Sequence, residues 1–446
     1  MSRLNELLEA YRDGEKQYIE ISASVSCREF CTDEVYCMGS GPDQVYCMGS
    51  GPDQLNRIGN GDNLQYMEYL IKDQKLKGKF QLIYVDPPFF SDSRYQASTR
   101  MESQFLGKSG LVKTGAYEDR WNMDFGEYIR MLTVRLLMMR DLLSDTGCLW
   151  VHLDWHAVHY VKVILDQIFG EKNFINEIIW TYKSGGANKR NFARKHDTLL
   201  FYSKTDNYIF NPQTEKSYNR GLRPYRFKGV EEYEDETGWY TIVNMKDVWS
   251  IDMVGRTSSE RTGYSTQKPE KLIERIVRAC SNEGDLCADF FAGSGSFGAV
   301  CGRLGRSWVM CDSGDFAAAA QAYRMASINQ NFILERSADG FGSTDSGTIV
   351  VNAGEYGIEL TDYKLDISGL HCSSRETVEE YYSRDSLSLV KFWGADTDYS
   401  GGAYRIDRLY DSADRKIQIK NNRKGQRIAV IGYNVFGGRF SAEIHI

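Results

Sequence analysis

The sequence lacks any long apolar run, and that absence argues against a membrane-spanning protein. No stretch approaches the ~20 apolar residues that a helix needs to cross a bilayer. The first residues, MSRLNELLEAYRDGEK, have a polar helical pattern without the apolar segment of a secretory signal. We therefore expect a cytoplasmic protein that is not held in a membrane.

The sequence also lacks an excess of positive charge. Its 54 Lys and Arg residues are outnumbered by 61 Asp and Glu residues, which gives a formal net charge of −7. The overall field of such a protein does not attract a polyanion, so any bound DNA must meet a local cluster of basic side chains. The apolar and charged fractions, 42% and 26%, are those of a globular protein and do not decide the function.

Paired cysteines are a third absence. Six of the ten cysteines are scattered singly, a pattern typical of reduced thiols in a cytosolic enzyme rather than of a disulfide framework. These six are Cys148, Cys280, Cys287, Cys301, Cys311 and Cys372. The other four are Cys27, Cys31, Cys37 and Cys47. They match no C-x2-C pattern, so a loop is the preferred interpretation and a zinc site the alternative.

A perfect tandem repeat lies near the N-terminus, where residues 35–44 (VYCMGSGPDQ) recur without change as residues 45–54. A single short duplication cannot bury a face of its own, because repeat folds need several copies. We interpret the repeat as a flexible insertion, a recent duplication or an artefact of the sequence.

The length of 446 residues predicts two or three domains. Residues 1–56 are expected to hold an N-terminal helix and an irregular insertion. Strand and helix patterns alternate in 57–181 and 256–337, which predicts the two halves of one α/β domain with a Rossmann-like sheet. Helical periodicity fades over 182–255, as in an inserted module, and 338–446 shows the short strands of a mixed or β-rich accessory domain.

Two strand-like runs end in turns that carry polar groups. Residues 80–85 (FQLIYV) are short and apolar, as in a parallel strand buried on both faces, and the tetrapeptide DPPF follows at 86–89. Residues 286–291 form a second run, which enters the segment AGSGS at 292–296. Functional loops of open α/β sheets lie at the carboxyl edge, so both turns are candidate parts of a site.

The glycine-rich segment predicts a ligand that contains a nucleoside. Gly293 and Gly295 let the backbone approach a ligand closely, and Asp312, after the next strand, can accept hydrogen bonds from ribose hydroxyls. Asp289 precedes the turn and is placed to pair with an ammonium group, which favours S-adenosylmethionine over a dinucleotide. A buried strand–turn–helix with structural glycines is the alternative.

The DPPF tetrapeptide predicts chemistry on an aromatic amine, whose lone pair is delocalised into the ring. Asp86 and the carbonyl of Pro87 can accept hydrogen bonds from such an amine and expose its lone pair. Pro88 helps to lock the peptide, and Phe89 offers a face on which a flipped base can stack. A strand-ending turn is the alternative, since Asp-Pro is common in turns.

The order of the motifs resembles that of one family. DPPF, a basic variable region, SERTGYSTQKPEKLIERIV, DFFAGSGS and WVMCD follow one another as in the beta class of amino-methyltransferases, the permuted group in which the catalytic loop precedes the cofactor loop. YEDRWNMDFGEYIRML, GCLWVHLD and IFGEKNFINEIIW look like adenine-specific members related to modification subunits of type III systems. The resemblance covers about residues 57–325 and implies a Rossmann-like domain that uses S-adenosylmethionine.

The resemblance also implies roles for single residues. The catalytic motif is Asp86, Pro87, Pro88 and Phe89, and the cofactor loop is Asp289, Phe290, Gly293 and Gly295, with Asp312 as the ribose-binding acid. Lys268 matches the motif that closes over the methionine end of the cofactor and could pair with its carboxylate, or could simply begin a helix. Asp62 either contacts the adenine amine of the cofactor or caps the helix that begins near residue 64.

Contacts to DNA are expected from basic residues of the 182–255 module, where aromatic residues are interleaved with them. The candidates are Lys183, Lys189, Arg190, Arg194, Lys195, Arg220, Arg223 and Arg226. Basic side chains neutralise phosphates, and aromatic ones can fill the gap that a flipped base leaves. A solvated basic surface is the alternative, and the acidic run at 231–236 argues against one continuous positive stripe.

These features predict a site-specific methyltransferase that moves a methyl group from S-adenosylmethionine to N6 of adenine in double-stranded DNA. Adenine is favoured because the tetrapeptide begins with Asp, whereas Ser accompanies cytosine in the family. A cytosine-N4 methyltransferase and a non-catalytic DNA-binding subunit of a modification complex are alternatives. RNA or a protein amide is a less favoured substrate. A restriction subunit and a second copy of the chain are further candidate partners, and no metal is expected.

Overall fold

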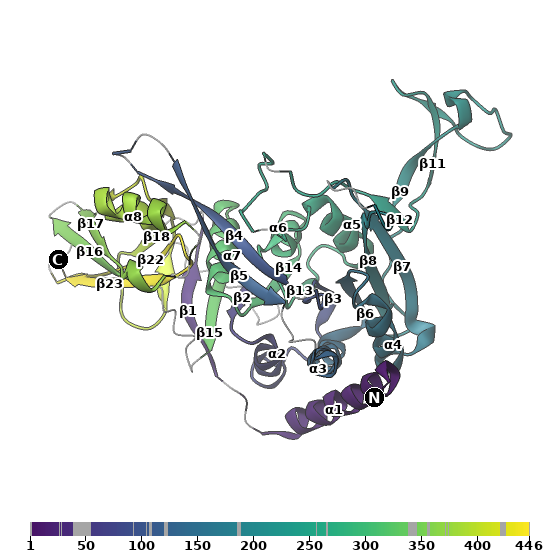
Figure 1. Cartoon of the computed structure of the whole chain (residues 1–446), viewed down its shortest axis with the longest axis horizontal. Coiled ribbons are helices and arrows are strands. Elements are labelled where there is room, and N and C mark those ends of the chain that lie inside the picture. Colours follow the sequence, from purple (N-terminus) through teal and green to yellow (C-terminus); the bar gives the residue numbers. More distant parts are fainter. Residues whose placement is uncertain are drawn as a thin grey trace.

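The centre of the molecule is an eleven-stranded sheet with helices on both faces (Figure 1). Across the sheet the strands are β12 (Val248–Ser250), β7 (Phe174–Thr181), β8 (His196–Ser203), β6 (Leu143–Leu153), β3 (Phe80–Val85), β13 (Leu286–Asp289), β14 (Ser307–Asp312), β2 (Arg57–Asn60), β15 (Phe332–Ser337), β1 (Phe30–Tyr36) and β19 (Tyr404–Ile406). The computed structural model describes residues 2–25, 27, 29–38, 55–91, 93–103, 105–106, 109–119, 124–184, 189–255, 257–264, 266–337, 346–354, 357–370, 372, 374–419 and 425–445.

Six central strands, from β6 to β15, run parallel. Parallel strands are covered on both faces, which explains why FQLIYV of β3 is apolar and buried at nearly every position. β8 runs antiparallel between β6 and β7. The arrangement confirms the predicted Rossmann-like α/β sheet.

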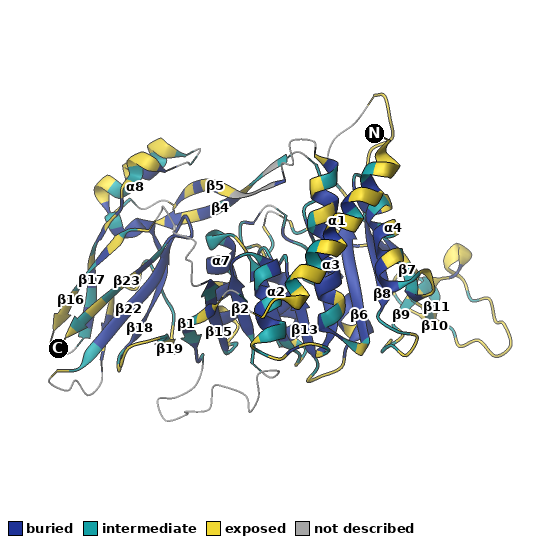
Figure 2. Cartoon of the chain, turned by 90° about the horizontal axis from the view of Figure 1, so that it is seen from below, coloured by how far each residue is buried: buried dark blue, intermediate teal, exposed yellow. Residues whose placement is uncertain are grey.

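Two layers of helices cover the sheet, and the burial view in Figure 2 shows the strands enclosed behind α1 to α4. One layer holds α1 (Arg3–Ala23), α2 (Asn63–Lys72), α3 (Phe125–Leu142) and α4 (Val158–Phe169), and the other holds α5 (Glu270–Cys280), α6 (Ser296–Arg303) and α7 (Asp315–Ser327). Side chains of β3 alternate between the layers, with Ile83 in the first core and Tyr84 in the second. No described helix is long and apolar enough to cross a bilayer.

The strand order reverses between β3 and β13. From β3 the chain goes on to β6 on one side, and from β13 it goes on to β14 on the other side. The loops that leave two such strands diverge, and a ligand crevice opens at their carboxyl ends. Asp86 follows β3 directly and Asp289 ends β13, so both predicted turns border this crevice.

The structure divides residues 182–255 between the sheet and a projecting arm. β8 and β12 join the large sheet, and the run LLFYS of β8 is buried. The arm comprises β9 (Thr214–Tyr218), β10 (Tyr233–Glu234) and β11 (Trp239–Asn244), which form a small sheet that extends away from the domain (Figure 1). Only the helical periodicity ends near residue 182. The apolar run of β8, which is typical of a buried strand, was not recognised from the sequence.

A long hairpin, β4 (Ser93–Glu102) with β5 (Ser109–Asp119), was not predicted. Its sequence is mostly polar because it forms a two-stranded ribbon rather than a buried strand. Met101 and Val112 of the hairpin are buried in the core of the C-terminal domain. Ala97, on the same ribbon, pairs with Tyr264 near the cofactor loop. The hairpin therefore connects the C-terminal domain with the part of the chain that builds the large sheet.

The C-terminal domain is rich in β-structure, as predicted. One sheet contains β16 (Thr348–Gly354), β17 (Gly357–Lys364) and β21 (Lys416–Gln418), and the other contains β20 (Tyr410–Asp411), β18 (Val390–Asp396), β22 (Arg427–Asn434) and β23 (Arg439–His445). α8 (Arg375–Arg384) packs beside them. Short 3-10 turns lie at Glu171–Asn173, Arg220–Leu222, Ile367–Gly369 and Ser386–Leu389.

The N-terminal segment contains the predicted helix and an unexpected strand. α1 packs on α3 so closely that a Cβ at Gly14 would lie 2.7 Å from Cβ of Thr133. β1 pairs with β15 and includes Val35 and Tyr36, where the first copy of the repeat begins. The expectation of a loop was therefore wrong for these two residues, because their backbone pairs with β15 on one side and β19 on the other. Residues 39–54, which hold the rest of the repeat and Cys47, lie outside the described residues.

A buried ionic cluster joins β1 to the C-terminal domain. Glu34 is fully buried, accepts hydrogen bonds of 2.6 Å from the hydroxyls of Tyr36 and Tyr433, and pairs with Arg439 at 3.1 Å. Burial alone would raise the pKa of Glu34, but the Arg439 and Arg336 guanidinium groups outweigh burial and hold this pKa below its ordinary value. The cluster therefore stabilises the fold as a set of charges.

Replacing Glu34 with alanine is expected to lower the free energy of unfolding by about 3–5 kcal/mol, since two buried tyrosine hydroxyls lose their acceptor and Arg336 and Arg439 keep only Asp33 of the two carboxylates they share. Because the pKa of Glu34 is depressed in the folded state, its contribution is present above the unfolded value of about 4.3 and is lost as the pH falls below it. Urea unfolding at neutral and acid pH measures both effects. The exposed Glu29→Ala is the control, and equal effects of the two substitutions would contradict the account.

Candidate active site

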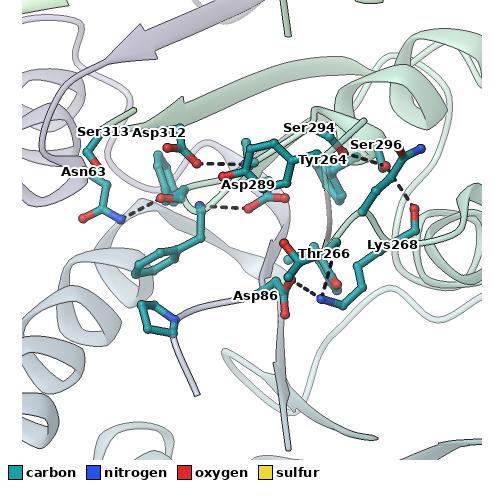
Figure 3. A pocket seen from close by; sticks show the side chains of 18 of the residues that line it. Asn63, Asp86, Tyr264, Thr266, Lys268, Asp289, Ser294, Ser296, Asp312 and Ser313 are labelled. Carbon is teal, nitrogen blue, oxygen red and sulfur yellow. Dashed lines mark hydrogen bonds and ion pairs between the residues drawn. The ribbon is translucent and has the colours of Figure 1, made fainter. Parts of the chain in front are cut away.

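A cavity of about 260 Å³ opens at the carboxyl ends of β3, β13 and β14 (Figure 3). Its wall includes eight of the residues predicted from the sequence: Asp62, Asp86, Pro88, Lys268, Asp289, Phe290, Gly293 and Asp312. Other wall residues include Asn63, Arg135, Tyr264, Phe291 and Ser313. The two turns that the sequence singled out therefore face one space.

Asp86 lies between two nitrogen-bearing side chains. Lys268 donates a hydrogen bond to Oδ2 of Asp86 (Figure 3), whereas the sequence-based prediction paired Lys268 with a cofactor carboxylate. Oδ1 of Asp86 is buried, accepts no hydrogen bond within the described part of the chain, and lies 3.8 Å from Nδ1 of His152. One carboxylate oxygen is thus neutralised by an ammonium group and the other is left as an open acceptor.

The loop that follows Asp86 is held by Asp119, at the end of β5. The Asp119 carboxylate accepts backbone hydrogen bonds from Phe89 at 3.0 Å, Phe90 at 3.1 Å and Ser91 at 2.8 Å. Tyr128 on α3 donates a 2.8 Å hydrogen bond to the carbonyl of Pro88. Phe90 adopts a left-handed backbone with φ of 61°, which a non-glycine residue keeps only where its surroundings fix it. These contacts make the tetrapeptide rigid.

The glycine loop wraps around Asp312. The amide of Gly293 donates to Oδ2 of Asp312 at 2.9 Å, and the amide of Gly314 donates to Oδ1 at 3.0 Å. Gly293 and Gly295 have φ of +48° and +75°, so side chains at either position would be strained. A Cβ at Gly293 would also lie 3.3 Å from the ring of Tyr264. The glycines are therefore required by the backbone, independently of any ligand.

The cavity gathers carboxyl groups and disfavours their ionisation. Burial raises the pKa of Asp289 well above its ordinary value, and the charges of Asp86 and Asp312 raise it further. Burial also raises the pKa of Asp312. Asp289 receives one backbone hydrogen bond, 2.9 Å from the amide of Phe291. Such a group of acids is complementary to a cationic ligand, whose charge would offset the repulsion among them.

The structure separates the roles of two adjacent phenylalanines. Phe290 was predicted to contact a cofactor, but its ring is fully buried in the core, 6.1 Å from the ring of Phe80. Its carbonyl faces outward and accepts a 2.6 Å hydrogen bond from Asn63. Phe291 is only partly buried and lies in the cavity wall. Side chains alternate at this strand end, so the ring available to a ligand is that of Phe291.

Asp62 acts as a helix cap. Its Oδ1 accepts hydrogen bonds from the amides of Leu64 at 3.0 Å and Gln65 at 3.2 Å, as expected for an N-cap residue. Its Oδ2 pairs with Arg135 of α3 at 2.7 Å, and Arg135 also donates to Asn63 at 2.6 Å. Capping does not exclude ligand contact, because Asp62 also lies in the cavity wall.

Some residues of the site were not found from the sequence. Asp119 and Arg135 belong to elements whose patterns point to packing, and only an arginine within an apolar helix face could have drawn attention to Arg135. His152, on β6, lies buried directly behind Asp86. The segment before α5 is tied to the glycine loop, since Ser296 donates a 3.0 Å hydrogen bond to the carbonyl of Lys268.

The basic residues proposed for DNA fall in two places. Lys183, Lys189, Arg190, Arg194 and Lys195 lie in the connection between β7 and β8, beside the strand ends that border the site. The guanidinium of Arg194 stacks 3.7 Å from the ring of Trp155, which follows β6. Lys195 donates to the carbonyl of Ser184 at 2.7 Å and therefore shapes this connection.

The second basic group, Arg220, Arg223 and Arg226, is exposed on the arm between β9 and β10. The acidic residues of the arm make specific hydrogen bonds within the arm. Glu232 accepts hydrogen bonds from the amides of Tyr225 at 2.8 Å and Arg226 at 2.7 Å, and Asp235 binds Lys216 at 2.6 Å. These acids hold the turn of the arm, and the three arginines remain at its surface.

Known proteins share the sequence of this region. The chain matches the DNA methylase family over residues 80–322. It is 28% identical over 309 residues to the type II methyltransferase M.EcaI of Enterobacter cloacae, covering 56% of this chain and 65% of that protein. It is 27% identical over 243 residues to M2.LlaDCHI of Lactococcus lactis subsp. cremoris, covering 54% and 80%. It is 34% identical over 157 residues to M1.MboII of Moraxella bovis, covering 31% and 57%. The chain thus spans less than two thirds of the length of M.EcaI and of M1.MboII.

Solved structures give weaker likenesses. The complex of M1.HpyAVI with SAM is 17% identical with a TM-score of 0.38, covering 60% of this chain and 98% of that one. The cytosine-N4-specific PvuII DNA methyltransferase is 17% identical with a TM-score of 0.41, covering 66% and 90%. The family match, by contrast, includes both strand ends that border the cavity and more than half of the chain. The chain therefore belongs to the DNA methylase family, whose cofactor is S-adenosylmethionine, as predicted from the sequence.

Proposed function

We propose that this chain transfers a methyl group from S-adenosylmethionine to N6 of adenine in double-stranded DNA. The observation that carries the proposal is that Asp86, after β3, and Asp289, at the end of β13, line one cavity. A catalytic loop and a cofactor loop that share a cavity can bring an amine and a methyl donor within reacting distance. Site specificity and the DNA substrate belong to the same proposal.

The cavity residues fit the cofactor. Asp289 is a buried carboxyl with a raised pKa, and an ammonium group beside it would restore its charge. Following the family resemblance, we assign Asp312 to the ribose hydroxyls, Lys268 to the cofactor carboxylate and Asp62 to the adenine amine. Because Gly293 and Gly295 carry no side chains, the backbone of the loop can approach a bound cofactor closely. When bound, S-adenosylmethionine supplies an electrophilic methyl group on a sulfonium.

The tetrapeptide would orient the target amine. Asp86 and the carbonyl of Pro87 accept its two N–H groups, which pulls the nitrogen toward a pyramidal geometry and exposes its lone pair. Phe89 lies beside Asp86, with its ring centroid 5.4 Å from Nζ of Lys268, and presents a face for the flipped base. Pro88, fixed by Tyr128, keeps these groups aimed at the cavity.

We infer that the chain belongs to the permuted beta class and is related to type III modification subunits. In the chain the catalytic tetrapeptide, 86–89, precedes the glycine loop, 292–296, although β3 and β13 are neighbours in the sheet. That order supports the class. Adenine is proposed as the target because the tetrapeptide begins with Asp86, as in the adenine-specific members that it resembles.

Nucleoside analysis tests the proposed base. DNA from a host without adenine methylation of its own, expressing this chain, should contain N6-methyladenine on digestion and mass spectrometry. The same host with an empty vector is the control. N4-methylcytosine without N6-methyladenine would contradict the choice of adenine, and no modified nucleoside would contradict the proposed activity.

The affinity for S-adenosylmethionine is expected to rise with pH. In the free protein Asp289 keeps its proton above the ordinary aspartate pKa of about 3.9, because burial raises its pKa. An ammonium ligand favours the ionised form, so binding at low pH must release this proton, and the cost disappears once the pH exceeds the raised pKa. Calorimetric titration over a pH series measures the effect.

A matched pair of variants isolates Asp289 in that titration. Asp289→Asn should bind more weakly and lose most of the acid-side dependence, and the remainder comes from Asp312, whose pKa is also raised, and from the ammonium of the ligand itself. Glu283→Gln changes an exposed carboxylate and should behave as wild type. An unchanged pH dependence in Asp289→Asn would show that this carboxyl does not face the ammonium.

The arm is proposed to bind DNA phosphates. Changing Arg220, Arg223 and Arg226 together to alanine should lower the slope of log affinity against log salt by ~0.9 for each phosphate that the arm no longer neutralises. Fluorescence anisotropy over a salt series measures the slope. The control changes Lys75, Lys77 and Lys79 to alanine. These three exposed lysines precede β3, at the end of that strand away from the cavity. Equal slopes for the two triple variants would exclude the arm as a DNA-binding surface.

A further inference from the structure

A buried chain of polar groups lies behind Asp86. His152 on β6 is fully buried, and its Nδ1 lies 3.0 Å from the hydroxyl of Tyr84 and 3.8 Å from Oδ1 of Asp86. Its Nε2 lies 3.3 Å from Oδ2 of Asp197. Tyr182 donates a 3.0 Å hydrogen bond to the other oxygen of Asp197. The imidazole therefore bridges the carboxylate of the tetrapeptide and a second, deeper carboxylate.

The register of three strands produces this bridge. Val85 of β3 pairs with Val151 of β6, so Asp86 comes level with His152 at the carboxyl edge. His152 in turn pairs with Leu199 of the antiparallel β8, which brings Asp197, near the start of β8, to the other side of the imidazole. The alignment depends on β8 lying between β6 and β7, and a one-residue slip would turn these side chains to the opposite face.

The surroundings exclude water from the imidazole. The rings of Trp180 and Phe89 lie 5.4 and 5.9 Å from it. Burying a polar group costs free energy unless it has a partner. Both nitrogens of this imidazole have one, the Tyr84 hydroxyl and the Asp197 carboxylate. Burial raises the pKa of Asp197, but the hydrogen bond and charge of His152 outweigh burial and leave this pKa below its ordinary value. Asp197 is therefore held as an anion.

The proposed reaction needs a proton acceptor at this place. The amine lone pair forms the N–C bond while the C–S bond of the methyl donor breaks and leaves its electron pair on sulfur. The methylated nitrogen then carries a positive charge and must lose one proton. Asp86 can take that proton, but its own carboxylate must be regenerated before the next turnover. An acceptor behind Asp86, screened from the cavity, fulfils this requirement.

We propose that His152 accepts, through Asp86, the proton that leaves the target amine, and that Asp197 stabilises the imidazolium that results. The inference rests on the proposed methyl transfer. The proton moves from nitrogen to a carboxylate oxygen of Asp86 and from Oδ1 to Nδ1 of His152, and the proton on Nε2 stays hydrogen-bonded to Asp197. His152 is a positioning residue that acts through Asp86, as the middle member of an Asp–His–Asp chain.

The hydrogen bonds of His152 support proton transfer from Asp86 to its Nδ1. With Nε2 donating to Asp197, Nδ1 carries the lone pair, which now receives the hydroxyl of Tyr84 and faces the open acceptor Oδ1 of Asp86. The gap of 3.8 Å is longer than a hydrogen bond, but catalytic hydrogen bonds often tighten only when substrate is bound. A rotation of Asp86 away from Lys268 would shorten the gap.

Other charged groups face the imidazole and enter any pH dependence. They are Asp86 and Tyr84 from β3 and its loop, Asp197 from β8, Tyr182 after β7 and Lys268 before α5, while Asp154, just after β6, interacts with Asp197. Asp86 and Asp197 flank the ring on opposite sides, and Lys268 is separated from it by Asp86. Variants at His152 and Asp197 must therefore be compared over a pH series rather than at one pH.

The test compares single-turnover rates of labelled methyl transfer to DNA over a series from about pH 5.5 to about pH 9. His152→Asn keeps a polar group on the side of Nδ1, and His152→Gln keeps one on the side of Nε2, but neither can take up a proton. Asp197→Asn keeps the hydrogen bond and removes the anion. His159→Asn, exposed on α4, is the matched control. Thermal melting and calorimetric binding of S-adenosylmethionine check that each variant is folded.

The wild-type rate should fall at the acid end of the series, because an imidazole that already holds a proton cannot accept another. Both His152 variants should transfer about 100-fold more slowly and lose that pH dependence, while they still bind S-adenosylmethionine. Asp197→Asn should shift the decline to lower pH, because without its counter-charge the imidazole takes up a proton less readily. A His152→Asn variant with the wild-type pH profile would overturn the relay, whether its rate were unchanged or lowered through stability. Absence of transfer by wild-type protein at every pH would instead overturn the proposed function.

Discussion

Replacing Asp86 with alanine is expected to lower the single-turnover rate of methyl transfer by about 100- to 1000-fold, the range found when one oriented polar group is removed from an active site. The substitution removes the acceptor that polarises the target amine. It also removes the partner of Lys268 and the carboxylate that lies 3.8 Å from Nδ1 of His152. Binding of S-adenosylmethionine should change little, because the ammonium is assigned to Asp289. Rapid quench with labelled cofactor and saturating DNA measures the rate.

A second variant separates charge from shape at this position. Asp86→Asn keeps one carbonyl acceptor for the amine and should retain more activity than Asp86→Ala. Asp145→Ala, which alters a carboxylate that is 88% exposed, is the matched control and should transfer at the wild-type rate. An Asp86→Ala variant within threefold of wild type would contradict the assignment of Asp86 to the reacting amine.

Replacing Asp119 with alanine is expected to lower the rate of methyl transfer by a comparable factor, although Asp119 does not contact the reacting atoms. Its buried carboxylate receives the amides of Phe89, Phe90 and Ser91, and a 2.7 Å hydrogen bond from the Ser91 hydroxyl. Without it the tetrapeptide loses its fixed conformation, and orientation alone is worth orders of magnitude in rate. Unfolding should become easier by about 3 kcal/mol or more, because several amides lose their acceptor.

Combined kinetic and stability measurements test the role of Asp119. Limited proteolysis near residue 90 should become faster in Asp119→Ala, and the rate of methyl transfer should fall about 100-fold. Lys113→Ala, at an exposed position of the same hairpin, is the control and should affect neither. A rate loss without faster proteolysis or lower stability would show that Asp119 acts in some way other than by holding the loop.

The sequence was sufficient for the parts of the site that sit at the ends of buried parallel strands. β3 and β13 are apolar runs whose polar neighbours, Asp86 and Asp289, stand out because a strand buried on both faces admits few polar residues. Their order along the chain also carried the family resemblance. The predicted strand ends therefore agree with the structure, and both border one cavity.

The partners of these residues could not be predicted, because they come from elements without a periodic signal. Asp119 ends a polar ribbon, and only the fold brings it back to the amides near residue 90. Asp197 precedes the apolar run of β8, and its meeting with His152 depends on β8 being inserted between β6 and β7. Pairings of this kind are set by tertiary register rather than by local propensity.

Phe290 and the N-terminal strand show a second limit. A motif indicates which residues form a loop, but which of two adjacent rings faces the ligand depends on the phase of the strand that enters it, and that phase favours Phe291. β1 lies in the segment that was expected to be irregular, and its sequence is FCTDEVY. Glu34 is in fact buried there, since Arg439 and the hydroxyls of Tyr36 and Tyr433 satisfy its carboxylate.

We propose that the Asp86 loop and the glycine loop bind one target base and one cofactor in one cavity. A crystal structure of the chain with S-adenosylmethionine tests it most directly. We predict the ammonium beside Asp289, the ribose beside Asp312, and the sulfonium methyl facing the Asp86 carboxylate across a space that fits an amine at about 3–3.5 Å from the methyl carbon. A cofactor bound outside this cavity, or inside it with the methyl turned away from Asp86, would contradict the account.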